Sequence, residues 1–217
     1  MKMKKKLFAG LGLLAAFALW TWAVKTVDVQ PIGPEGSCVG FAAVNRYVHG
    51  LTGVHFALYT LTDWLGLVPA AFCFGFAALG LVQWMKRKSL LQVDRSLFVL
   101  AGFYIVVISA YLLFEVWAVN FRPVCIEGRL EASYPSSTTL LVLCVIPTAA
   151  MQLQGRIQNA VCRKAVCGIL SGFALFMTAG RLVSGVHWVT DIVGGVLLSA
   201  GLVMLYTAFA GAAEKDR

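Results

Sequence analysis

Two short segments of the sequence hold side chains that could carry out phosphoryl chemistry. His187 and Asp191 are four residues apart, so on a helix they would lie on one face. A carboxylate beside an imidazole fixes its tautomer and stabilises its cation, which suits a histidine that attacks an electrophile. Arg122 and Arg181 each offer a planar guanidinium, the group that best matches phosphate oxygens. We interpret these four residues as the centre of a phosphoryl-transfer site.

A third segment, residues 134–139, supplies hydroxyl groups immediately before an apolar stretch. Ser136 and Ser137 stand where a helix would begin, and the free N–H groups and dipole of a helix N-terminus favour a bound anion. Each feature also has a simpler explanation. His187 and Asp191 could be a surface pair, the arginines could extend into the lipid headgroups, and a serine could cap the helix. The phosphoryl-transfer interpretation is favoured because all three segments fall on the same predicted side of a membrane.

The composition places most of the chain in lipid. Of its 217 residues, 59% are hydrophobic and 13% charged, and the mean hydropathy is +0.81. An average soluble domain is roughly 45–50% apolar and about 25% charged. A chain this short leaves about a third of its unfolded surface exposed after folding, too much to hide so many apolar residues from water. These properties exclude a soluble globular domain, a disordered tail and a disulfide-stapled secreted module.

The apolar residues form blocks that predict an all-α integral membrane protein, a bundle of six transmembrane helices. A spanning helix needs about 20 mainly apolar residues. Between the first two spans, residues 39–53 place Asn45, Arg46 and His49 on one helical face, which predicts an interfacial amphipathic helix. The first block follows several lysines, but its length and the lack of a clear A-x-A site favour an uncleaved anchor over a signal peptide. The predicted spans are residues 7–24, 61–84, 97–119, 139–153, 166–181 and 188–210.

The distribution of positive charge predicts the orientation. Most of the 18 Lys and Arg residues fall on one side, in residues 2–6, 86–95, 156–164 and 215–217. Because cytoplasmic loops are enriched in Lys and Arg, both termini are expected in the cytoplasm and the site at the outer face of the cell membrane. The net charge of +8 reflects this bias, and nucleic acid is not an expected partner because no basic, aromatic-rich patch lies outside the apolar blocks.

The six cysteines carry little information about function. They form no C-x-x-C pair, so structural zinc is not expected. Cys38 and Cys125 both fall on the predicted outer side, where a disulfide and two free thiols are both open.

The three segments together resemble the type 2 phosphatidic acid phosphatase family, membrane relatives of the vanadium haloperoxidases. The family pattern is K-x6-R-P, then P-S-G-H, then S-R-x5-H-x3-D. The third element matches at Arg181, His187 and Asp191, with Gly180 in place of Ser. The other two match at Arg122, Pro123, Pro135 and Ser136, with Glu115 in place of Lys, and Ser137 and Thr138 in place of Gly and His.

The resemblance implies an organisation and a role for each matched residue. Residues 1–217 would form a single membrane domain with a phosphatase-like core at about residues 54–210. His187 would be the nucleophile that forms a phosphohistidine, and Asp191 would orient it. No metal or cofactor is expected, because arginines supply the positive charge. The phosphate would be held by Arg122, Arg181 and Ser136, with the backbone N–H of Ser137.

The replacement of the family's general acid by Thr138 bears on the substrate. A threonine hydroxyl is too weak an acid to protonate an alkoxide at neutral pH, and losing a general acid costs on the order of 10²–10⁴ in rate. A polyprenyl diphosphate would remove this need, because the phosphate that leaves it is a stable anion. Alternatively, another residue donates the proton. The candidates for this donor near the outer face are Glu115, His49, His55, Glu131 and Tyr134, while Thr138 itself is an accessory residue of the site.

Glu115 has two interpretations of its own. It lies two helical turns before Arg122, so the two side chains can share a face. We favour an ion pair between Glu115 and an arginine over a buried, protonated Glu115 that donates a proton.

The expected function is hydrolysis of lipid phosphates or polyprenyl diphosphates by an integral membrane phosphatase. Two alternatives stay open. One is a lipid phosphotransferase that uses His187 to pass the phosphoryl group to an alcohol, and the other is a catalytically reduced protein that binds or transports lipid phosphate. The expected partners are the lipid substrate and the membrane lipids, with a homodimer also open.

Overall fold

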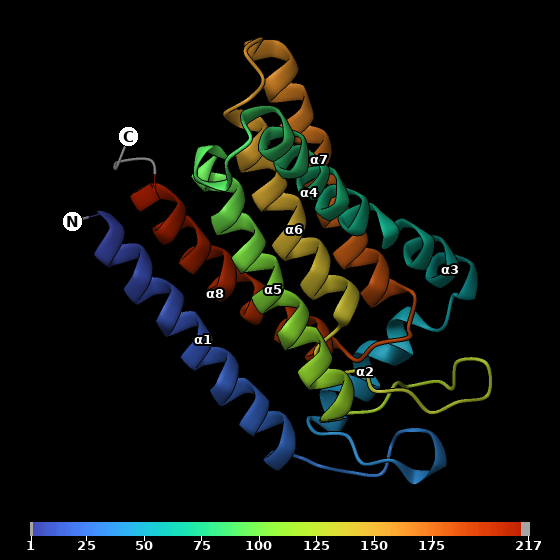
Figure 1. The fold of residues 1–217 in the computed structure, drawn as a ribbon. Helices are drawn as coiled ribbons and strands as arrows, with labels where there is room; N and C mark the ends of the chain where they lie inside the picture. Colours follow the sequence, from blue (N-terminus) through green and yellow to red (C-terminus); the bar gives the residue numbers. More distant parts are fainter. Residues whose placement is uncertain (1, 214–217) are drawn as a thin grey trace.

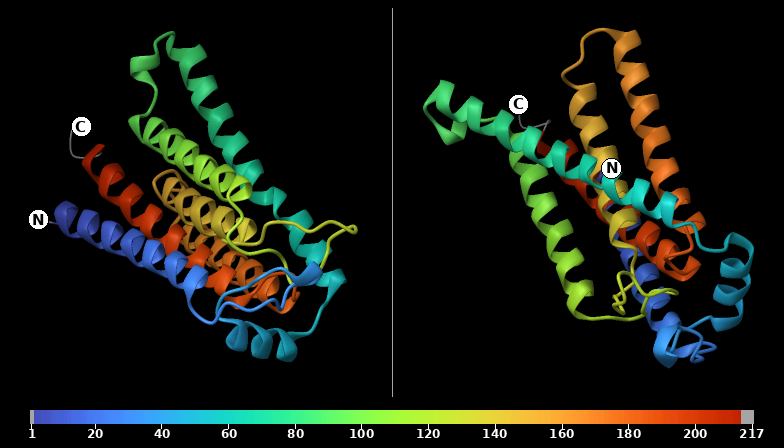
Figure 2. Two further views of the ribbon diagram at one scale, coloured as in Figure 1. Left: turned by 90° about the horizontal axis from the view of Figure 1, so that it is seen from below. Right: turned by 90° about the vertical axis from the view of Figure 1, so that its right-hand side faces the viewer.

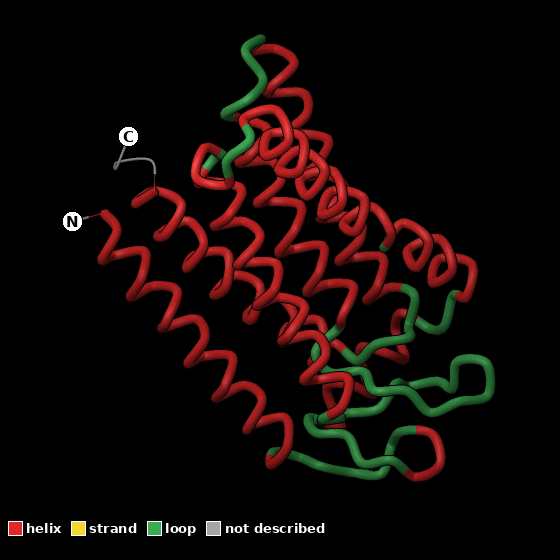
Figure 3. Tube along the Cα trace, in the orientation of Figure 1, coloured by secondary structure: helices red, strands yellow, loops and turns green. Residues whose placement is uncertain are grey.

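The protein consists of helices joined by loops (Figures 1 and 3). A computed structural model describes residues 2–213. Within this range no β-strand occurs, only isolated β-bridges, and two short 3₁₀ helices lie at Pro34–Gly36 and Leu90–Gln92. The α-helices are α1 (Lys2–Thr26), α2 (Ala42–Thr52), α3 (Phe56–Leu65), α4 (Leu67–Arg87), α5 (Arg95–Val116), α6 (Ser137–Gln154), α7 (Ala160–Val183) and α8 (Val189–Ala213).

Six helical segments are long and apolar enough to span a membrane, which confirms the predicted fold. α3 and α4 follow one another across Gly66 and together form one of these segments, Phe56–Arg87. The third predicted span, residues 97–119, was too long at its end. α5 stops at Val116, where Trp117 leaves the helical conformation with φ −99° and ψ 80°. Hydropathy continued through this boundary because the residues that follow the helix are also apolar.

The longer loops gather at one end of the bundle. The beginning of α1 and the end of α8 lie together at the opposite end (Figures 1 and 2). The loop end holds the segment 117–136 between α5 and α6, the turn 184–188 between α7 and α8, and the residues that link α2 to α3 (Figure 3). All three segments that the sequence singled out for chemistry therefore meet at this end.

The centre of the bundle is formed by α6 and α8, which are the most buried of the six spans. α1 packs along α8, and the indole of Trp20 donates a hydrogen bond to the carbonyl of Thr190, 3.1 Å away. The remaining spans turn large apolar side chains outward, such as Phe74 on α4 and Leu175 on α7. An apolar outer surface of this kind is stable in lipid and not in water.

The predicted amphipathic helix is present as α2, and of the polar residues predicted to share one face, Asn45 is buried, His49 is partly buried and Arg46 is exposed. Asn45 is fully buried and donates to Thr190 Oγ1 at 3.0 Å. Tyr47 and Leu51, in contrast, are 68% and 70% exposed. The sequence pattern shows only that the two faces differ, and here the amide of Asn45 donates to Gly40 and Thr190 of the protein itself. α2 thus supports the loop end of the bundle and turns apolar side chains outward.

The six cysteines are all free thiols, including Cys38 and Cys125 on the loops at this end. Of the two alternatives open for that pair, the structure has the free thiols.

Candidate active site

The turn between α7 and α8 fixes the position of His187. Gly185 in this turn has φ +69°, a conformation that L side chains rarely adopt, and a Cβ there would lie 1.8 Å from the carbonyl oxygen of Gly53. The carbonyl of Ser184 also accepts a hydrogen bond from the N–H of His55 at 3.0 Å. The turn is therefore hydrogen-bonded to the link between α2 and α3, and its close approach to Gly53 requires glycine at position 185.

His187 and Asp191 face one another, with the hydroxyl of Ser133 between them. The imidazole Nδ1 lies 3.7 Å from Asp191 Oδ2 and 3.1 Å from Ser133 Oγ. Ser133 also donates a short hydrogen bond to Asp191 Oδ2. All three side chains are at least nine-tenths buried. Serine thus links the imidazole to the carboxylate through hydrogen bonds on both sides.

Asp191 is held by two further donors. The side-chain amide of Asn120 lies 3.3 Å from Oδ1, and the backbone N–H of Trp188 donates to Oδ2 at 2.9 Å. The N–H of Ser133 in turn donates to the carbonyl of Asn120 at 2.9 Å. These donors, together with Ser133, hold the buried carboxylate of Asp191 in one orientation.

These contacts assign the tautomer of His187. The hydroxyl of Ser133 donates its proton in the hydrogen bond to Asp191, so Ser133 Oγ must accept the hydrogen bond from the N–H at Nδ1 of His187. The lone pair of Nε2 then lies on the opposite side of the ring, where it accepts a hydrogen bond from Arg122 Nη1 at 3.2 Å. Burial, and then the positive charges of Arg122 and Arg181, hold the pKa of His187 well below its ordinary value. The imidazole is therefore neutral and its Nε2 available as a nucleophile.

Arg122 comes from the loop between α5 and α6, which doubles back on itself. An isolated bridge joins Phe121 to Ala132 on the two arms of this loop. The side chain of Arg122 is 9% exposed, and its Nε lies 3.0 Å from Glu131 Oε2. The loop thus presents Arg122 to His187 with a carboxylate already beside it.

Arg181 is held by one face of α3. Its Nη2 lies 3.4 Å from Asp63 Oδ1, its Nη1 lies 3.4 Å from Thr62 Oγ1, and its guanidinium carbon lies 5.0 Å from the ring centre of Tyr59. Residues 59, 62 and 63 are three and four positions apart, so a single helical face makes all three contacts. α3 therefore holds the guanidinium of Arg181 through three contacts.

Both arginines line one open cavity of about 520 Å³ at the loop end of the bundle. The buried Nε of Arg181 has no hydrogen-bond partner among the described residues, whereas that of Arg122 lies at ion-pair distance from Glu131. Within the same residues, no group of three or more His, Cys, Asp or Glu is placed to hold a metal ion. The cavity is lined by Tyr59, Asp63, Tyr111, Glu115, Arg122, Arg129, Leu130, Glu131, Ala132, Ser137, Thr138 and Arg181.

The sequence of this region matches a known superfamily. A sequence model of the PAP2 superfamily covers residues 99–215, more than half of the chain. The chain belongs to the PAP2 superfamily. This confirms the resemblance drawn from the three motif segments, all of which fall inside the matched range.

The fold is also shared with a solved PAP2 protein. The chain is similar to the first transmembrane PAP2 type phosphatidylglycerolphosphate phosphatase from Bacillus subtilis, with a TM-score of 0.58 and 19% sequence identity. The similarity covers 96% of this chain and 97% of that chain. A comparison with curated proteins gave no match. At this identity the likeness establishes the common membrane fold and nothing finer.

Not every residue predicted from the PAP2 motifs lies in the cavity. Ser136 caps α6, where its hydroxyl accepts from Thr139 Oγ1 at 3.0 Å, and it is not among the lining residues. Ser137 and Thr138, the next two residues, do line the cavity. Of the two serines predicted to hold the phosphate, Ser137 therefore lies on the cavity and Ser136 does not.

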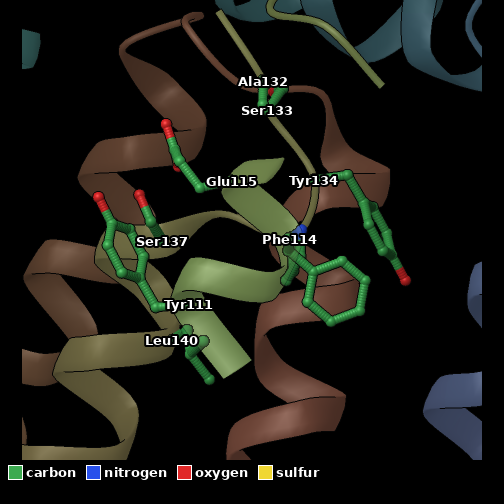
Figure 4. A pocket seen from close by; sticks show the side chains of 9 residues that line it. Tyr111, Phe114, Glu115, Ala132, Ser133, Tyr134, Ser137 and Leu140 are labelled. Atoms are coloured by element: carbon green, nitrogen blue, oxygen red, sulfur yellow. The ribbon is translucent and has the colours of Figure 1, made fainter. Parts of the chain in front are cut away.

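Glu115 lines the cavity, and among the described residues it does not form the ion pair we favoured. Among the described contacts the two arginines pair with Asp63 and Glu131 instead. Figure 4 shows Glu115, Tyr111 and Ser137 directing their oxygens to the same side of a narrow crevice, and Tyr134 pointing away from it. Glu115 thus adds a carboxylate to the cavity and does not restrain an arginine directly.

The two accessory histidines lie outside the cavity lining. His49 lies 3.1 Å from the carbonyl of Gly185, and His55 lies 2.8 Å from that of Thr52. Both therefore bond to backbone carbonyls in or near the turn before α8. Neither histidine lies in the cavity, where a proton donor would have to replace the one missing at Thr138.

Three side chains of the site were not identified from the sequence: Asp63, Asn120 and Ser133. Their only sequence signal is polarity within or beside an apolar block: Asp63 is the single acidic residue of its span, and Ser133 stands close before the second motif. Their partners are distant in the chain, so the contacts could not be read from local spacing. Glu131 was named only as a possible proton donor, and the structure places it beside Arg122 instead.

Proposed function

We propose that the protein is an integral membrane phosphatase that hydrolyses lipid phosphates or polyprenyl diphosphates through a phosphohistidine at His187. One observation carries this proposal. Nε2 of a neutral, oriented imidazole lies 3.2 Å from the guanidinium of Arg122, which shares its cavity with Arg181. Membership of the PAP2 superfamily and the fold of a lipid phosphatase support it.

The reaction follows from this arrangement in two steps. In the first, the substrate phosphate replaces His187 as the partner of Arg122, and Nε2 attacks phosphorus while the bond to the leaving oxygen breaks. The leaving group departs with the electron pair, and the imidazolium that forms is stabilised through Ser133 by Asp191. In the second, water attacks the phosphohistidine, which releases phosphate and restores the imidazole. The two guanidiniums stabilise the charge on the oxygens throughout.

The leaving group decides which substrate suits the site best. Thr138 lines the cavity where the family has its general acid, and neither histidine outside the cavity replaces it. A leaving group that needs no proton is therefore favoured, and a polyprenyl diphosphate releases such a group. The lipid monophosphate named for the solved relative is the competing substrate class.

The site is proposed to face the outside of the cell membrane, with both termini in the cytoplasm. The beginning of α1 and the end of α8 share the end of the bundle opposite the cavity (Figure 2). The loops at that end, residues 88–94 and 155–159, adjoin most of the Lys and Arg that predict a cytoplasmic location.

A phosphate-release assay on the purified protein in detergent tests this function. Undecaprenyl diphosphate, phosphatidylglycerol phosphate and phosphatidic acid are compared, and we expect the diphosphate to be cleaved fastest. His187→Ala should abolish release from all three. Faster cleavage of a matched monophosphate would contradict the diphosphate preference. An added acceptor alcohol that becomes phosphorylated would instead identify a phosphotransferase, and normal cellular function of His187→Ala would identify a carrier.

A further inference from the structure

Each phosphate-facing arginine already has a carboxylate partner from outside the three PAP2 motifs. Arg181 pairs with Asp63 on α3, and Arg122 pairs with Glu131 in the loop before α6. The two members of each pair differ in exposure. The side chain of Arg181 is 2% exposed and that of Asp63 57%, while Arg122 is 9% and Glu131 39% exposed.

This difference in exposure determines which member can leave the pair. A buried guanidinium without a counterion is costly, so the carboxylates stabilise the empty site. A half-exposed carboxylate can turn into water at little cost, since exposed ion pairs contribute little net stability. Arg181 is also held by Tyr59 and Thr62, so it stays in place when Asp63 moves.

The charges of the cavity are balanced before a ligand enters. Asp63, Glu115 and Glu131 face Arg122, Arg129 and Arg181 across one space. A ligand that displaces two carboxylates must offset two positive charges. The terminal phosphate of a monoester or diphosphate can carry two negative charges, whereas the phosphodiester of an ordinary phospholipid carries one.

We propose that Asp63 and Glu131 are resident counterions that a terminal phosphate displaces and a phosphodiester does not. They would keep the abundant phosphodiester headgroups of the surrounding membrane out of the site. The inference rests on the proposed function, because it concerns the same site, and it assigns the two carboxylates as its specificity determinants.

Binding of small anions tests the proposal without turnover. Inorganic phosphate and dimethyl phosphate are titrated calorimetrically into the full-length protein in detergent, and into Asp63→Asn and Glu131→Gln. Each variant frees one arginine, so we expect inorganic phosphate to bind about two- to fivefold more tightly. The affinity for dimethyl phosphate should rise by at least the same factor, so that the preference for inorganic phosphate over dimethyl phosphate falls.

Glu115→Gln is the matched control. It removes one carboxylate from the same cavity and changes the charge equally, but Glu115 pairs with neither arginine in the described contacts. We expect it to change phosphate affinity by less than either test variant and to preserve the selectivity. Asp63→Glu, which keeps the charge, should bind as the unmodified protein does.

Weaker phosphate binding in Asp63→Asn and Glu131→Gln, or gains no larger than those of Glu115→Gln, would overturn the proposal. If Asp63→Asn fails to fold, as judged by its thermal unfolding, Glu131→Gln on the exposed loop still decides. A protein that shows these binding changes but releases no phosphate from any lipid would keep the counterion inference and refute the phosphatase.

Discussion

The hydroxyl of Ser133 separates the two members of the histidine–aspartate pair. It accepts from Nδ1 of His187 and donates to Asp191, so the proton of the imidazole lies on Nδ1 and the lone pair on Nε2. At this scale the site depends on one chain of hydrogen bonds that runs from Asn120 and Trp188 through the carboxylate to the imidazole.

Ser133→Ala should lower kcat by about ten- to a hundredfold, the effect of losing a hydrogen bond to a charged group. KM should change little, because Ser133 is not among the residues that line the cavity with the arginines. Steady-state kinetics on a lipid diphosphate measure both. Ser133→Thr keeps the hydroxyl and should recover most of the rate. A loss confined to KM, or equal losses in both variants, would refute the orienting role.

The pH dependence of kcat/KM should reflect the lowered pKa of His187. Burial and the two arginines disfavour its cation, so the neutral nucleophile persists at pH values where an ordinary imidazole, with a pKa of about 6.5, is half protonated. As the pH falls, activity should therefore hold through this range and decline only at more acidic pH. An acid limb centred at or above the ordinary value would contradict the assigned environment.

At the scale of elements, the site is assembled by packing between helix ends. The turn 184–188 reaches its position because Gly185 lies against Gly53, and α3 lies against α7 so that Asp63 meets Arg181. α3 precedes the range matched by the PAP2 model, yet it supplies part of the cavity wall.

Gly185→Ala should destabilise the protein by about 1–3 kcal/mol, because its φ of +69° and the carbonyl 1.8 Å from a Cβ leave no room for the methyl group. Thermal unfolding in detergent and the rate of phosphate release should both fall, since the turn carries His187. Gly172→Ala on α7 is the control, because nothing lies within 4 Å of a Cβ there. If the two variants behave alike, the close packing of the turn is not what positions the histidine.

Some elements and contacts could be predicted from the sequence and others could not. The spans were predictable because each is a long apolar block, whereas the end of α5 was not, since Trp117 is apolar outside the helix. His187 and Asp191 were predictable from spacing within one segment. The pairing of Arg181 with Asp63 was not, because it joins residues 118 positions apart through the packing of two helices.

At the scale of the whole molecule, the two ends of the bundle carry different groups. One end carries the basic loops and the beginning of α1, and the other gathers the cavity and its supporting turns (Figures 1 and 3). The apolar exterior of the six spans places this arrangement across a membrane.

The central claim is that His187, Arg122 and Arg181 converge on one anion. A structure of the protein with bound orthovanadate, a phosphate analogue that histidine can ligate, tests this most directly. We predict vanadium bonded to Nε2 of His187, with vanadate oxygens accepting hydrogen bonds from both guanidiniums. Vanadate bound by only one of the arginines, or bound away from His187, would contradict the account.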